Sequence, residues 1–549
     1  MDHTKQKIEM WDVKKLMSDY VREHARDMPE KVAINYYGRK VSFKELNESS
    51  DRLANAIADM GYKKGDRVAV FLQTSPQVYI SYLSALRLGL IIVPIDPMSK
   101  EFELEYALND SGASLVIAFD QFYPIIKNLK DKVGIRHVIL TSFNDYLPEN
   151  PEFPLHKMMH VEKQTFPDTY DLPTLIGKYS STPPKVNINL NDYAWILYTG
   201  GTTGYPKGCL HTQYAFTLSS LSWRDVFYEG ATKEDIVLLS WPHTHVSGIT
   251  FGVGPLFICG LTVVPLARWD ALAAMQAIDK YKVTIVHWTV PQYPSVIDHP
   301  ENKNYDLTSL RVSIYVSFGM VITDNMVDQW KKLTRCHLRQ GAGYGSSEHF
   351  NYGAVGNYMP TPHPPVIGSG YPLPGFEVKI MDFDTREELP VGEVGEIVTK
   401  SPCQIKEYWN KPEESRVDII DGWLHMHDRG YVDREENIYF LGKKAEIVKV
   451  SGYNVALKEV EMVALKNPAI DRIAVIALPH PKKGNQLKAF VTLKPDNKAT
   501  NSELEEWFNN QLAAIKCPVV EIRGSLPTSG KGEILKRVLL AEEQERSKG

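Results

Sequence analysis

YTGGTTGYPKG, from Tyr198 to Gly208, is the stretch of the sequence that decides the fold. It follows the apolar run WILY (Trp195 to Tyr198), which is typical of a buried strand. Glycines let a backbone approach an anion, threonine hydroxyls donate hydrogen bonds, and Lys207 adds a compact positive charge. The stretch therefore predicts a phosphate-binding loop, although a surface turn rich in glycine and threonine has the same composition. It is not a P-loop, because the spacing GxxxxGK[ST] is absent.

Short β-branched runs alternate with longer amphipathic runs on both sides of this loop, beginning near residue 30. This alternation predicts an α/β fold with two halves, each built on a mostly parallel sheet. Ser75 and Pro76 predict the start of a helix that runs to about Leu88. The first half is expected to hold strands at Arg67 to Leu72, Ser114 to Phe119 and His137 to Leu140, and the second half to begin at Trp195 and continue at Ile236 to Ser240, Leu261 to Leu266, Val283 to Trp288 and Arg311 to Gly319.

Two regions depart from the alternation. Residues 145 to 190 are rich in proline and polar side chains, which favours an irregular excursion over the surface. After about Pro360, turn signals follow one another closely, as in GSGYPLPGF and PVGEVGE. A small β-rich layer followed by a final α+β unit is therefore expected.

The composition limits the kinds of molecule that the protein is expected to bind. The chain has 549 residues, 43% of them hydrophobic, and a formal net charge of -5 without a basic cluster for nucleic acid. Its five cysteines are scattered and odd in number, which indicates neither a disulfide framework nor a metal cluster. No apolar stretch reaches the roughly 18 residues that a membrane span needs, and no signal core follows the first methionine. We expect a cytoplasmic protein that binds small molecules, with no integral membrane segment.

The sequence resembles the adenylate-forming superfamily of acyl-CoA synthetases, peptide-synthetase adenylation domains and beetle luciferases. The signature loop of that family is Tyr-Thr-Ser-Gly-Thr-Thr-Gly-x-Pro-Lys-Gly, and this chain differs from it only at Gly200. The resemblance implies a large N-terminal domain, residues 1–443, of two α/β sheet subdomains plus a β-rich layer, and a small mobile α+β C-terminal domain, residues 444–549. It extends in the family's order through VSFKEL (Val41 to Leu46), LRLGLIIVPIDP (Leu86 to Pro97), PHTHVSG (Pro242 to Gly248), GYGSSE (Gly343 to Glu348), GWLHMHDRGYVD (Gly422 to Asp433) and VSGYNVALKEVE (Val450 to Glu461).

The resemblance implies ATP, Mg²⁺ and coenzyme A as co-substrate. Attack of a carboxylate on the α-phosphorus of ATP brings anions together, so positive charge and positioning must supply catalysis. Lys207, Glu348 and Lys531 are the expected catalytic residues, and Glu348 with Thr202 the expected magnesium site, since Mg²⁺ prefers oxygen ligands. The nucleotide is expected to contact Thr199, Gly200, Gly201, Thr202, Thr203, Gly204, Lys207, Tyr344, Gly345, Ser346, Ser347, Asp428 and Lys443, with Asp428 on the ribose hydroxyls.

The C-terminal region departs from the family pattern at three positions. Lys443 stands where arginine is usual, and Ala445 stands at the hinge, commonly aspartate or lysine. Glu533 occupies the position of the lysine that reaches the α-phosphate when the chains are aligned without gaps. We hypothesise that Lys531 substitutes for that lysine. The alternative is a solvated loop, slow adenylation and an intact thioester half-reaction.

The acyl pocket is expected to be apolar, which suits a fatty or aromatic acid. By family position its lining is His245, Val246, Gly248, Trp288, Phe318, Gly319 and Tyr344. The polar neighbours His287, Gln292 and Ser317 leave room for an oxygenated acid, and each also has the chemistry to satisfy buried backbone. Coenzyme A is placed by resemblance near Ser451, Gly452 and Tyr453.

Two HxH pairs, His243/His245 and His425/His427, raise the question of a metal site, because alternate residues of a strand share a face. Packing roles are favoured over metal binding, since no third ligand lies near in sequence.

A carboxylate–CoA ligase that forms acyl-AMP and pyrophosphate is the leading hypothesis. An amino-acid-activating domain is disfavoured, because WPHTHVSG lacks the aspartate that holds an α-amino group. Luciferase-like oxidation and another acyl acceptor stay open. An ATP- or AMP-binding sensor or pseudoenzyme is the alternative outside enzymology, suggested by Lys443, Ala445 and Glu533. Chain length of the acid and the formation of a homodimer are also open.

Overall fold

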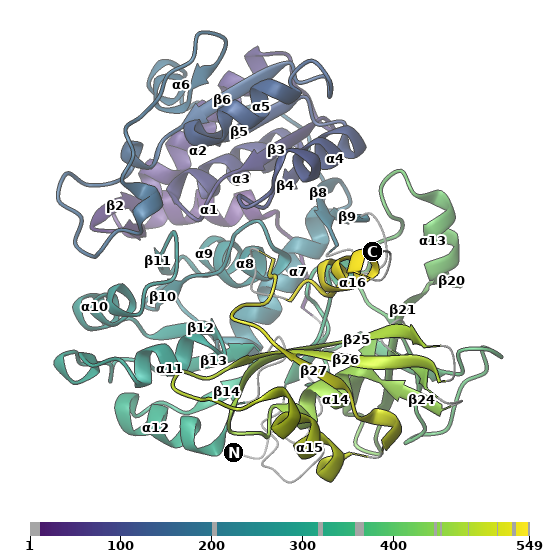
Figure 1. Ribbon diagram of the computed structural model, residues 1–549. Helices are drawn as coiled ribbons and strands as arrows, with labels where there is room; N and C mark the ends of the chain where they lie inside the picture. Colours follow the sequence, from purple (N-terminus) through teal and green to yellow (C-terminus); the bar gives the residue numbers. More distant parts are fainter. Residues whose placement is uncertain are drawn as a thin grey trace.

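The computed structural model describes residues 11–199, 206–316, 322–356, 367–443, 447–450, 453–480, 483–512, 514–529 and 534–546. Within these ranges the strands form two seven-stranded sheets, one eight-stranded sheet and two smaller sheets (Figure 1). The predicted α/β class, with a large N-terminal part and a small C-terminal part, is confirmed.

The first sheet has the strand order β7-β6-β5-β3-β4-β8-β9. Its pairs are parallel except for the hairpin of β8 and β9, which encloses the loop after Tyr198. Helix α3 (Pro76–Leu88) starts and ends as predicted, and its C-cap is Gly89, whose positive φ of 66° suits glycine. The strands are β3 (Arg67–Phe71), β4 (Ile91–Pro94), β5 (Leu115–Phe119), β6 (His137–Thr141), β7 (Tyr170–Asp171), β8 (Tyr193–Tyr198) and β9 (Gly208–Thr212).

The second sheet has the order β14-β13-β12-β10-β11-β1-β2. The sequence prediction that the second half begins at Trp195 is wrong, because Trp195 of β8 pairs with Ile92 of β4 in the first sheet. Conversely, Ile34 of the early strand β1 pairs with Val263 in the second sheet. The strands are β1 (Val32–Tyr36), β2 (Arg39–Ser42), β10 (Ile236–Leu239), β11 (Thr262–Pro265), β12 (Ile285–Thr289), β13 (Val312–Val316) and β14 (Leu338–Gln340).

Helices cover both sheets (Figure 1). Every residue of α3 is buried, which agrees with its apolar residues all around the helix. No helix in the described ranges combines the length and the apolar character that a bilayer crossing requires. The other helices of this part are α1 (Met17–Asp27), α2 (Phe43–Asp59), α4 (Glu101–Ser111), α5 (Tyr123–Leu129), α7 (Gln213–Ser222), α8 (Val246–Gly248), α9 (Gly254–Cys259), α10 (Ala271–Tyr281), α11 (Gln292–Ile297) and α12 (Asp324–Thr334).

Residues 145 to 190 are less irregular than predicted. They contain β7, which pairs with β6, and the helix α6 (Leu172–Lys178). Asp171 caps this helix, since its carboxylate accepts a hydrogen bond from the Thr174 amide at 3.1 Å. The proline-rich composition hid a helix in which Pro173 occupies the first turn, where no amide donor is missed.

The β-rich layer predicted after Pro360 is present as the eight-stranded sheet. Its order is β15-β16-β17-β22-β21-β19-β18, with the short strand β20 beside β21, and the paired strands are antiparallel. Helix α13 (Pro412–Asp418) runs directly into β20. The strands are β15 (Ala342–Tyr344), β16 (Ala354–Gly356), β17 (Ile367–Pro372), β18 (Glu377–Met381), β19 (Gly395–Lys400), β20 (Ile419–Ile420), β21 (Trp423–Val432) and β22 (Ile438–Lys443).

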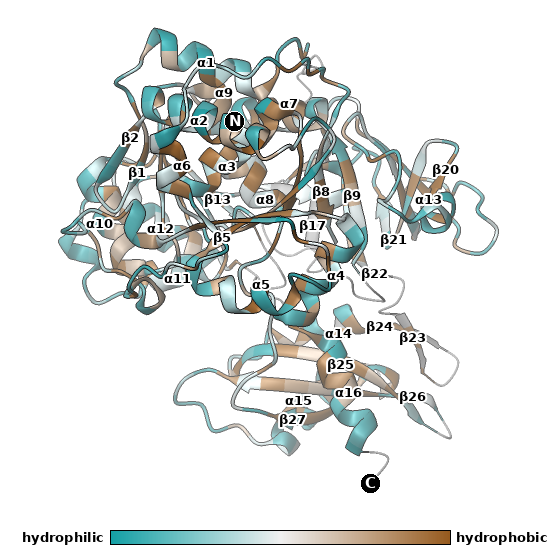
Figure 2. Cartoon of the chain, turned by 90° about the horizontal axis from the view of Figure 1, so that it is seen from above, coloured by the Kyte–Doolittle hydropathy of each residue, from teal (hydrophilic) through white to brown (hydrophobic). Residues whose placement is uncertain are grey.

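The C-terminal elements gather on one side of the molecule in both views (Figures 1 and 2). They build a three-stranded sheet β25-β26-β27 and a hairpin of β23 and β24 around an apolar cluster that includes Val475, Val491 and Phe508. The boundary between residues 443 and 444 stays a prediction. The elements are β23 (Ile447–Val450), β24 (Tyr453–Ala456), α14 (Leu457–Ala464), β25 (Ile470–His480), β26 (Gly484–Leu493), α15 (Asn501–Gln511), β27 (Val519–Ile522) and α16 (Lys536–Arg546).

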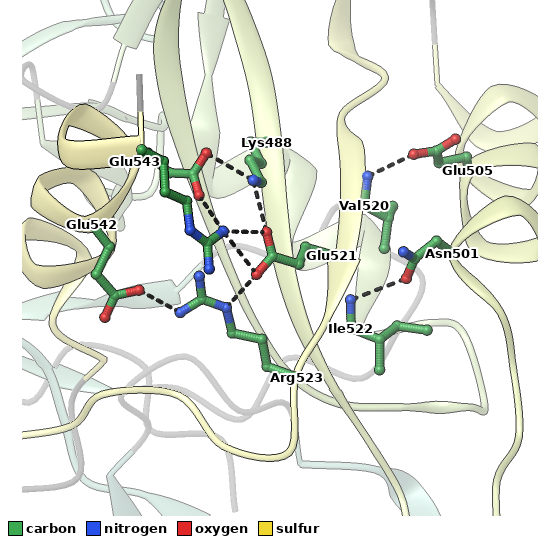
Figure 3. Close-up of polar contacts among 10 residues, drawn as sticks. Lys488, Asn501, Glu505, Val520, Glu521, Ile522, Arg523, Glu542 and Glu543 are labelled. Atoms are coloured by element: carbon green, nitrogen blue, oxygen red, sulfur yellow. Dashed lines mark hydrogen bonds and ion pairs between the residues drawn. The ribbon is translucent and has the colours of Figure 1, made fainter. Parts of the chain in front are cut away.

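Ion pairs fix α16 to this sheet (Figure 3). Lys488 of β26 lies 2.7 Å from Glu521 of β27 and 2.8 Å from Glu543 of α16. Arg523 joins Glu521 to Glu542. Because each charge meets at least one opposite charge, the cluster supports the packing of the last helix without leaving a lone charge at the interface.

Candidate active site

The loop after β8 is closed at its base by hydrogen bonds between its two ends. The Thr199 amide donates to the Lys207 carbonyl at 3.0 Å, and the Lys207 amide donates to Thr199 Oγ1 at 3.1 Å. The Tyr198 hydroxyl donates to Asp110 Oδ2 of α4 at 2.7 Å. The base is thus held by α4 as well as by the hairpin. The predicted phosphate ligands Gly200, Gly201, Thr202, Thr203 and Gly204 lie outside the described residues.

The Lys207 ammonium lies against two groups of the β-rich layer. Its Nζ is 2.5 Å from Asp418 Oδ2 at the end of α13 and 4.6 Å from the centre of the Tyr408 ring. A backbone contact supports this arrangement, because the Trp409 amide donates to the Gly208 carbonyl at 2.7 Å. The lysine side chain is one-third exposed, so it borders solvent while its partner carboxylate is buried.

Glu348 contacts the hydroxyl of the same Tyr408. Its side chain is buried, and Tyr408 Oη lies 3.4 Å from Glu348 Oε1. The loop that carries it is fixed by the His211 imidazole, which contacts the Ser347 carbonyl at 2.7 Å, and by the Ile405 amide, which donates to the Glu348 carbonyl at 2.9 Å. A carboxylate with one long hydrogen bond among the described residues retains oxygen lone pairs for a ligand.

This donor set fits a magnesium ion. Mg²⁺ takes carboxylate oxygen and keeps much of its water, and Glu348 offers a carboxylate beside the lysine expected at the phosphates. The other predicted ligand, Thr202, lies outside the described residues.

Tyr344 and Asp428, two of the predicted nucleotide contacts, are joined by a hydrogen bond. The Tyr344 hydroxyl donates to Asp428 Oδ2 at 2.7 Å, and both residues are buried. Burial first, and then the nearby Asp428 charge, raise the pKa of Tyr344 well above its usual value, so the phenol stays a donor. Asp428 is on β21, opposite Lys443 of β22 in the register. It is therefore a strand residue and not the turn residue that a lone Asp-Arg-Gly suggests.

The neighbouring loop residues have structural partners. Ser346 Oγ lies 2.9 Å from His349 Nδ1 at the start of a short helical turn. Gly345 packs against Asn351, where an added Cβ would lie 3.3 Å from Asn351 Oδ1. Because these contacts hold the backbone between Tyr344 and Glu348, the two predicted site residues are fixed relative to each other.

The acyl side of the site begins at α8. His245 is its N-cap, and its Nδ1 accepts a hydrogen bond from the Ser247 amide at 3.2 Å. Val246 and Gly248 follow, both buried. Glycine is required at 248, because a Cβ there would lie 2.0 Å from the Pro242 carbonyl oxygen. This close approach folds the PHTHVSG segment back on itself.

Trp288 and His287 point to opposite faces of β12, as neighbouring strand residues do. Trp288 packs against Trp269, Tyr293 and Trp330, the last two from α11 and α12. His287 packs against Phe251, which follows His245 in the chain. Its neighbours thus make the His287 side chain, more than the predicted Trp288, a candidate for the pocket near His245.

His287 is fully buried, and neither ring nitrogen has a hydrogen-bond partner among the described residues. Trp223 stacks on it at 5.2 Å between ring centres, with an interplanar angle of 19°. Burial lowers its pKa well below the usual value, so the ring is neutral. A buried imidazole without a hydrogen bond lowers the stability of the fold, and such groups are rare in folded proteins.

The two HxH pairs do not follow the simple strand alternation that would place both histidines of a pair on one face. His243 and His245 lie outside strands, and His243 is a fully buried packing residue whose Nε2 lies 2.5 Å from the Tyr79 hydroxyl. Both His425 and His427 contact Glu396, but a bulge separates them. In the described ranges, no group of three or more histidine, cysteine, aspartate or glutamate side chains is arranged to hold a metal ion.

Other predicted positions stay untested. Within the C-terminal part, Lys536 Nζ lies 2.9 Å from Glu461 Oε1, so this lysine is engaged inside its own domain. The segment before it is closed by a bridge between Thr528 and Ile534. Phe318, Gly319, Ser317, Ala445, Ser451, Gly452, Lys531 and Glu533 lie outside the described residues, as do the side chains of Lys443 and Tyr453.

Sequence reasoning missed Asp418 and Tyr408, which contact Lys207 directly, and Glu396, which is linked to Lys207 through His427 and Asp418. Asp418 lies in EESRVDII and Glu396 in GEVGE, both of which resemble ordinary charged surface segments. Tyr408 follows a charged turn and shows no periodic signal. Only the folded structure shows that these side chains are buried together.

Two family models match the chain. The AMP-binding enzyme model matches residues 21–409, and the model for the AMP-binding enzyme C-terminal domain matches residues 459–533. The chain therefore belongs to the AMP-binding enzyme family. Within that family it is an acyl-CoA synthetase.

Curated relatives agree with this class over almost the whole length. A long-chain-fatty-acid–CoA ligase from Bacillus subtilis is 34% identical, with 97% of this chain and 95% of the relative covered. A protein of the same name from Escherichia coli is 30% identical, with 92% and 90% covered.

Solved structures show the same fold. ATP-bound MatB from Rhodopseudomonas palustris superposes with a TM-score of 0.80 at 24% identity, covering 96% of this chain and 98% of that one. An anthranilate CoA ligase in complex with anthranoyl-AMP gives a TM-score of 0.81 at 23% identity, covering 97% and 98%. At these identities the likeness concerns the fold alone.

Proposed function

We propose that this carboxylate–CoA ligase activates a fatty or aromatic acid with MgATP and transfers the acyl group to coenzyme A. ATP and coenzyme A are the co-substrates of the family, and Mg²⁺ at Glu348 is part of the proposal. The observation that carries it is the convergence of three distant motifs, in which Lys207 and Glu348 both contact Tyr408 while Tyr344 hydrogen-bonds Asp428.

The first half-reaction forms a bond between a carboxylate oxygen of the acid and the α-phosphorus of ATP, and pyrophosphate leaves. Lys207 supplies positive charge where negative charge develops, and Asp428 accepts hydrogen bonds from the ribose. Bound Mg²⁺ would neutralise phosphate charge near Glu348.

In the second half-reaction the thiol of coenzyme A loses its proton to solvent, its sulfur forms a bond to the acyl carbon, and the bond from that carbon to the AMP oxygen breaks, so that AMP leaves. Lys531 belongs to the first half-reaction, in which it is proposed to replace the α-phosphate lysine whose position Glu533 occupies. Ser451, Gly452 and Tyr453 are proposed to lie near coenzyme A. The acyl pocket is proposed to lie beside His245 and His287. Its buried aromatic neighbours Trp223 and Phe251 suit an apolar chain or ring.

AMP release with ATP, coenzyme A and a panel of saturated acids of increasing length plus benzoate tests the proposal. AMP and acyl-CoA should form together with at least one of the acids. Lys207→Met is the matched inactive control, since it keeps side-chain length and removes the charge. Binding of ATP without AMP release for any acid would contradict the proposal and favour a nucleotide sensor.

A further inference from the structure

Strand β21 contains a bulge beside the proposed ATP site. Val398 of β19 pairs with His425 and the adjacent Ile397 pairs with Asp428, so two residues of β21 are left over between them. One of them, His427, has a φ of 54°, a left-handed conformation that is uncommon for residues with a side chain. Bulges redirect side chains, and backbone outliers of this kind gather at functional sites.

The bulge places the His427 imidazole between two buried carboxylates. Its Nε2 lies 3.1 Å from Asp418 Oδ1, and its Nδ1 lies 3.0 Å from Glu396 Oε1. Two nitrogens can donate to two carboxylates only in the protonated ring. The hydrogen bonds to Asp418 and Glu396 raise the pKa of His427 to about 9, so the ring is charged at neutral pH.

Asp418 is shared by two cations. Its other oxygen, Oδ2, is 2.5 Å from the Lys207 ammonium. Burial alone would raise the pKa of Asp418, but the hydrogen bonds from His427 and Lys207 outweigh it and lower the pKa. A carboxylate that is neutralised by His427 attracts Lys207 less strongly than one that has Lys207 as its sole cationic partner.

Lys207 has to serve the ATP phosphates, and Asp418 competes with them for the same ammonium. We propose that His427 is a positioning residue for ATP binding: by sharing Asp418 with Lys207, it weakens the hold of this carboxylate on the lysine and lets the ammonium move to the phosphates. When Lys207 moves, His427 remains to neutralise Asp418. The inference rests on the proposed role of Lys207.

The test is a double-mutant cycle on His427 and Asp418 with the full-length protein. His427→Gln is expected to raise the KM for MgATP about fivefold to tenfold, with a smaller change in kcat and in the KM for the acid. Asp418→Asn in the same chain removes the competing charge and should return the KM for MgATP to within about twofold of the Asp418→Asn single variant. His425→Gln is the matched control, because His425 contacts Glu396 at 3.2 Å without a hydrogen bond to Asp418 in the described structure.

The inference would be overturned if Asp418→Asn did not relieve the loss of MgATP affinity in His427→Gln. A structural defect of the bulge would add its effect to that of Asp418→Asn. An equal loss in His425→Gln would also overturn it. If His427→Gln lowers the unfolding temperature, His427→Lys keeps a cation near Asp418 and should retain wild-type affinity for MgATP. Equilibrium titration with MgATP, without acid or coenzyme A, measures the same coupling even if no acid in the panel is activated, and separates this inference from the proposed function.

Discussion

The proposed nucleotide side and the proposed acyl side of the site differ in how they treat polar groups. Around Lys207 the structure gathers charges and pairs them, with Asp418, Glu396 and His427 linked in a chain of contacts. Around His287 it gathers aromatic rings and leaves a polar ring without a hydrogen bond among the described residues. The paired charges suit ATP, which is the same charged co-substrate whichever acid is activated. The aromatic rings suit an acyl group, which differs among relatives of this fold.

Loss of the Lys207 charge should give the largest effect. Lys207→Met is expected to slow acid-dependent pyrophosphate exchange about 100-fold to 1000-fold, because a charge aimed at the reacting phosphates is lost. The decrease should be the same for every acid in the panel. Lys207→Arg is the control that keeps the positive charge and changes the shape of the side chain. A decrease in rate that depends on the acid would show that the nucleotide side and the acyl side do not act separately.

Removal of the Tyr344 hydroxyl should come next. Tyr344→Phe deletes the hydrogen bond to Asp428, which is worth about 1.5–3 kcal/mol for a charged acceptor, so the KM for MgATP should rise about tenfold or more. Tyr352→Phe is a matched control: its hydroxyl donates to the Pro374 carbonyl, remote from Asp428. An unchanged affinity for MgATP in Tyr344→Phe would remove Asp428 from the ribose site.

His287 offers the corresponding experiment on the acyl side. His287→Phe replaces an unsatisfied imidazole by an apolar ring, so the free energy of unfolding should stay the same or rise by about 1 kcal/mol. The relative rates among acids should change while the KM for MgATP does not. Denaturant unfolding and the acid panel measure the two effects. A loss of stability would show that the imidazole has a hydrogen-bond partner in the folded protein.

The smallest expected effect is the pH dependence of stability from His427. Its pKa is about 9 in the folded protein and ordinary in the unfolded chain, so its stabilising effect is complete below pH 6.5 and disappears as pH rises through 9. The side chain is half exposed, which limits the contribution to about 1 kcal/mol. Wild type and His427→Gln should therefore differ in denaturant midpoint at pH 6 and converge at pH 10. A constant difference would contradict a charged His427.

The sequence predicted the helices and strands better than it predicted which strands pair with each other. Ser75 and Pro76 marked the start of α3, and the apolar runs marked the strands, because those signals are local. The exchange of β1 and β8 between the sheets was missed, since strand order depends on contacts between distant segments. The helix after Asp171 was hidden by composition that also suits a loop.

The site follows the same rule. Lys207, Glu348 and Asp428 were predicted as site residues because each lies in a recognisable motif, and the structure brings their segments together. Asp418 and Tyr408 were missed because no local pattern distinguishes a buried partner from a surface charge or a core ring. Trp288 and His287 were both named for the acyl pocket, because a strand presents alternate residues to alternate faces and the sequence did not show which face meets α8.

The exchange of strands between the sheets also constrains how the chain acquires its structure during synthesis. Strand β1 leaves the ribosome early, yet its partner β11 is not complete until Pro265 has been made. Until then the β1–β2 hairpin has an open edge that a foreign strand could pair with. This part of the core therefore cannot form until more than 200 further residues have been synthesised. Truncated products that end before β11 should need chaperones or aggregate.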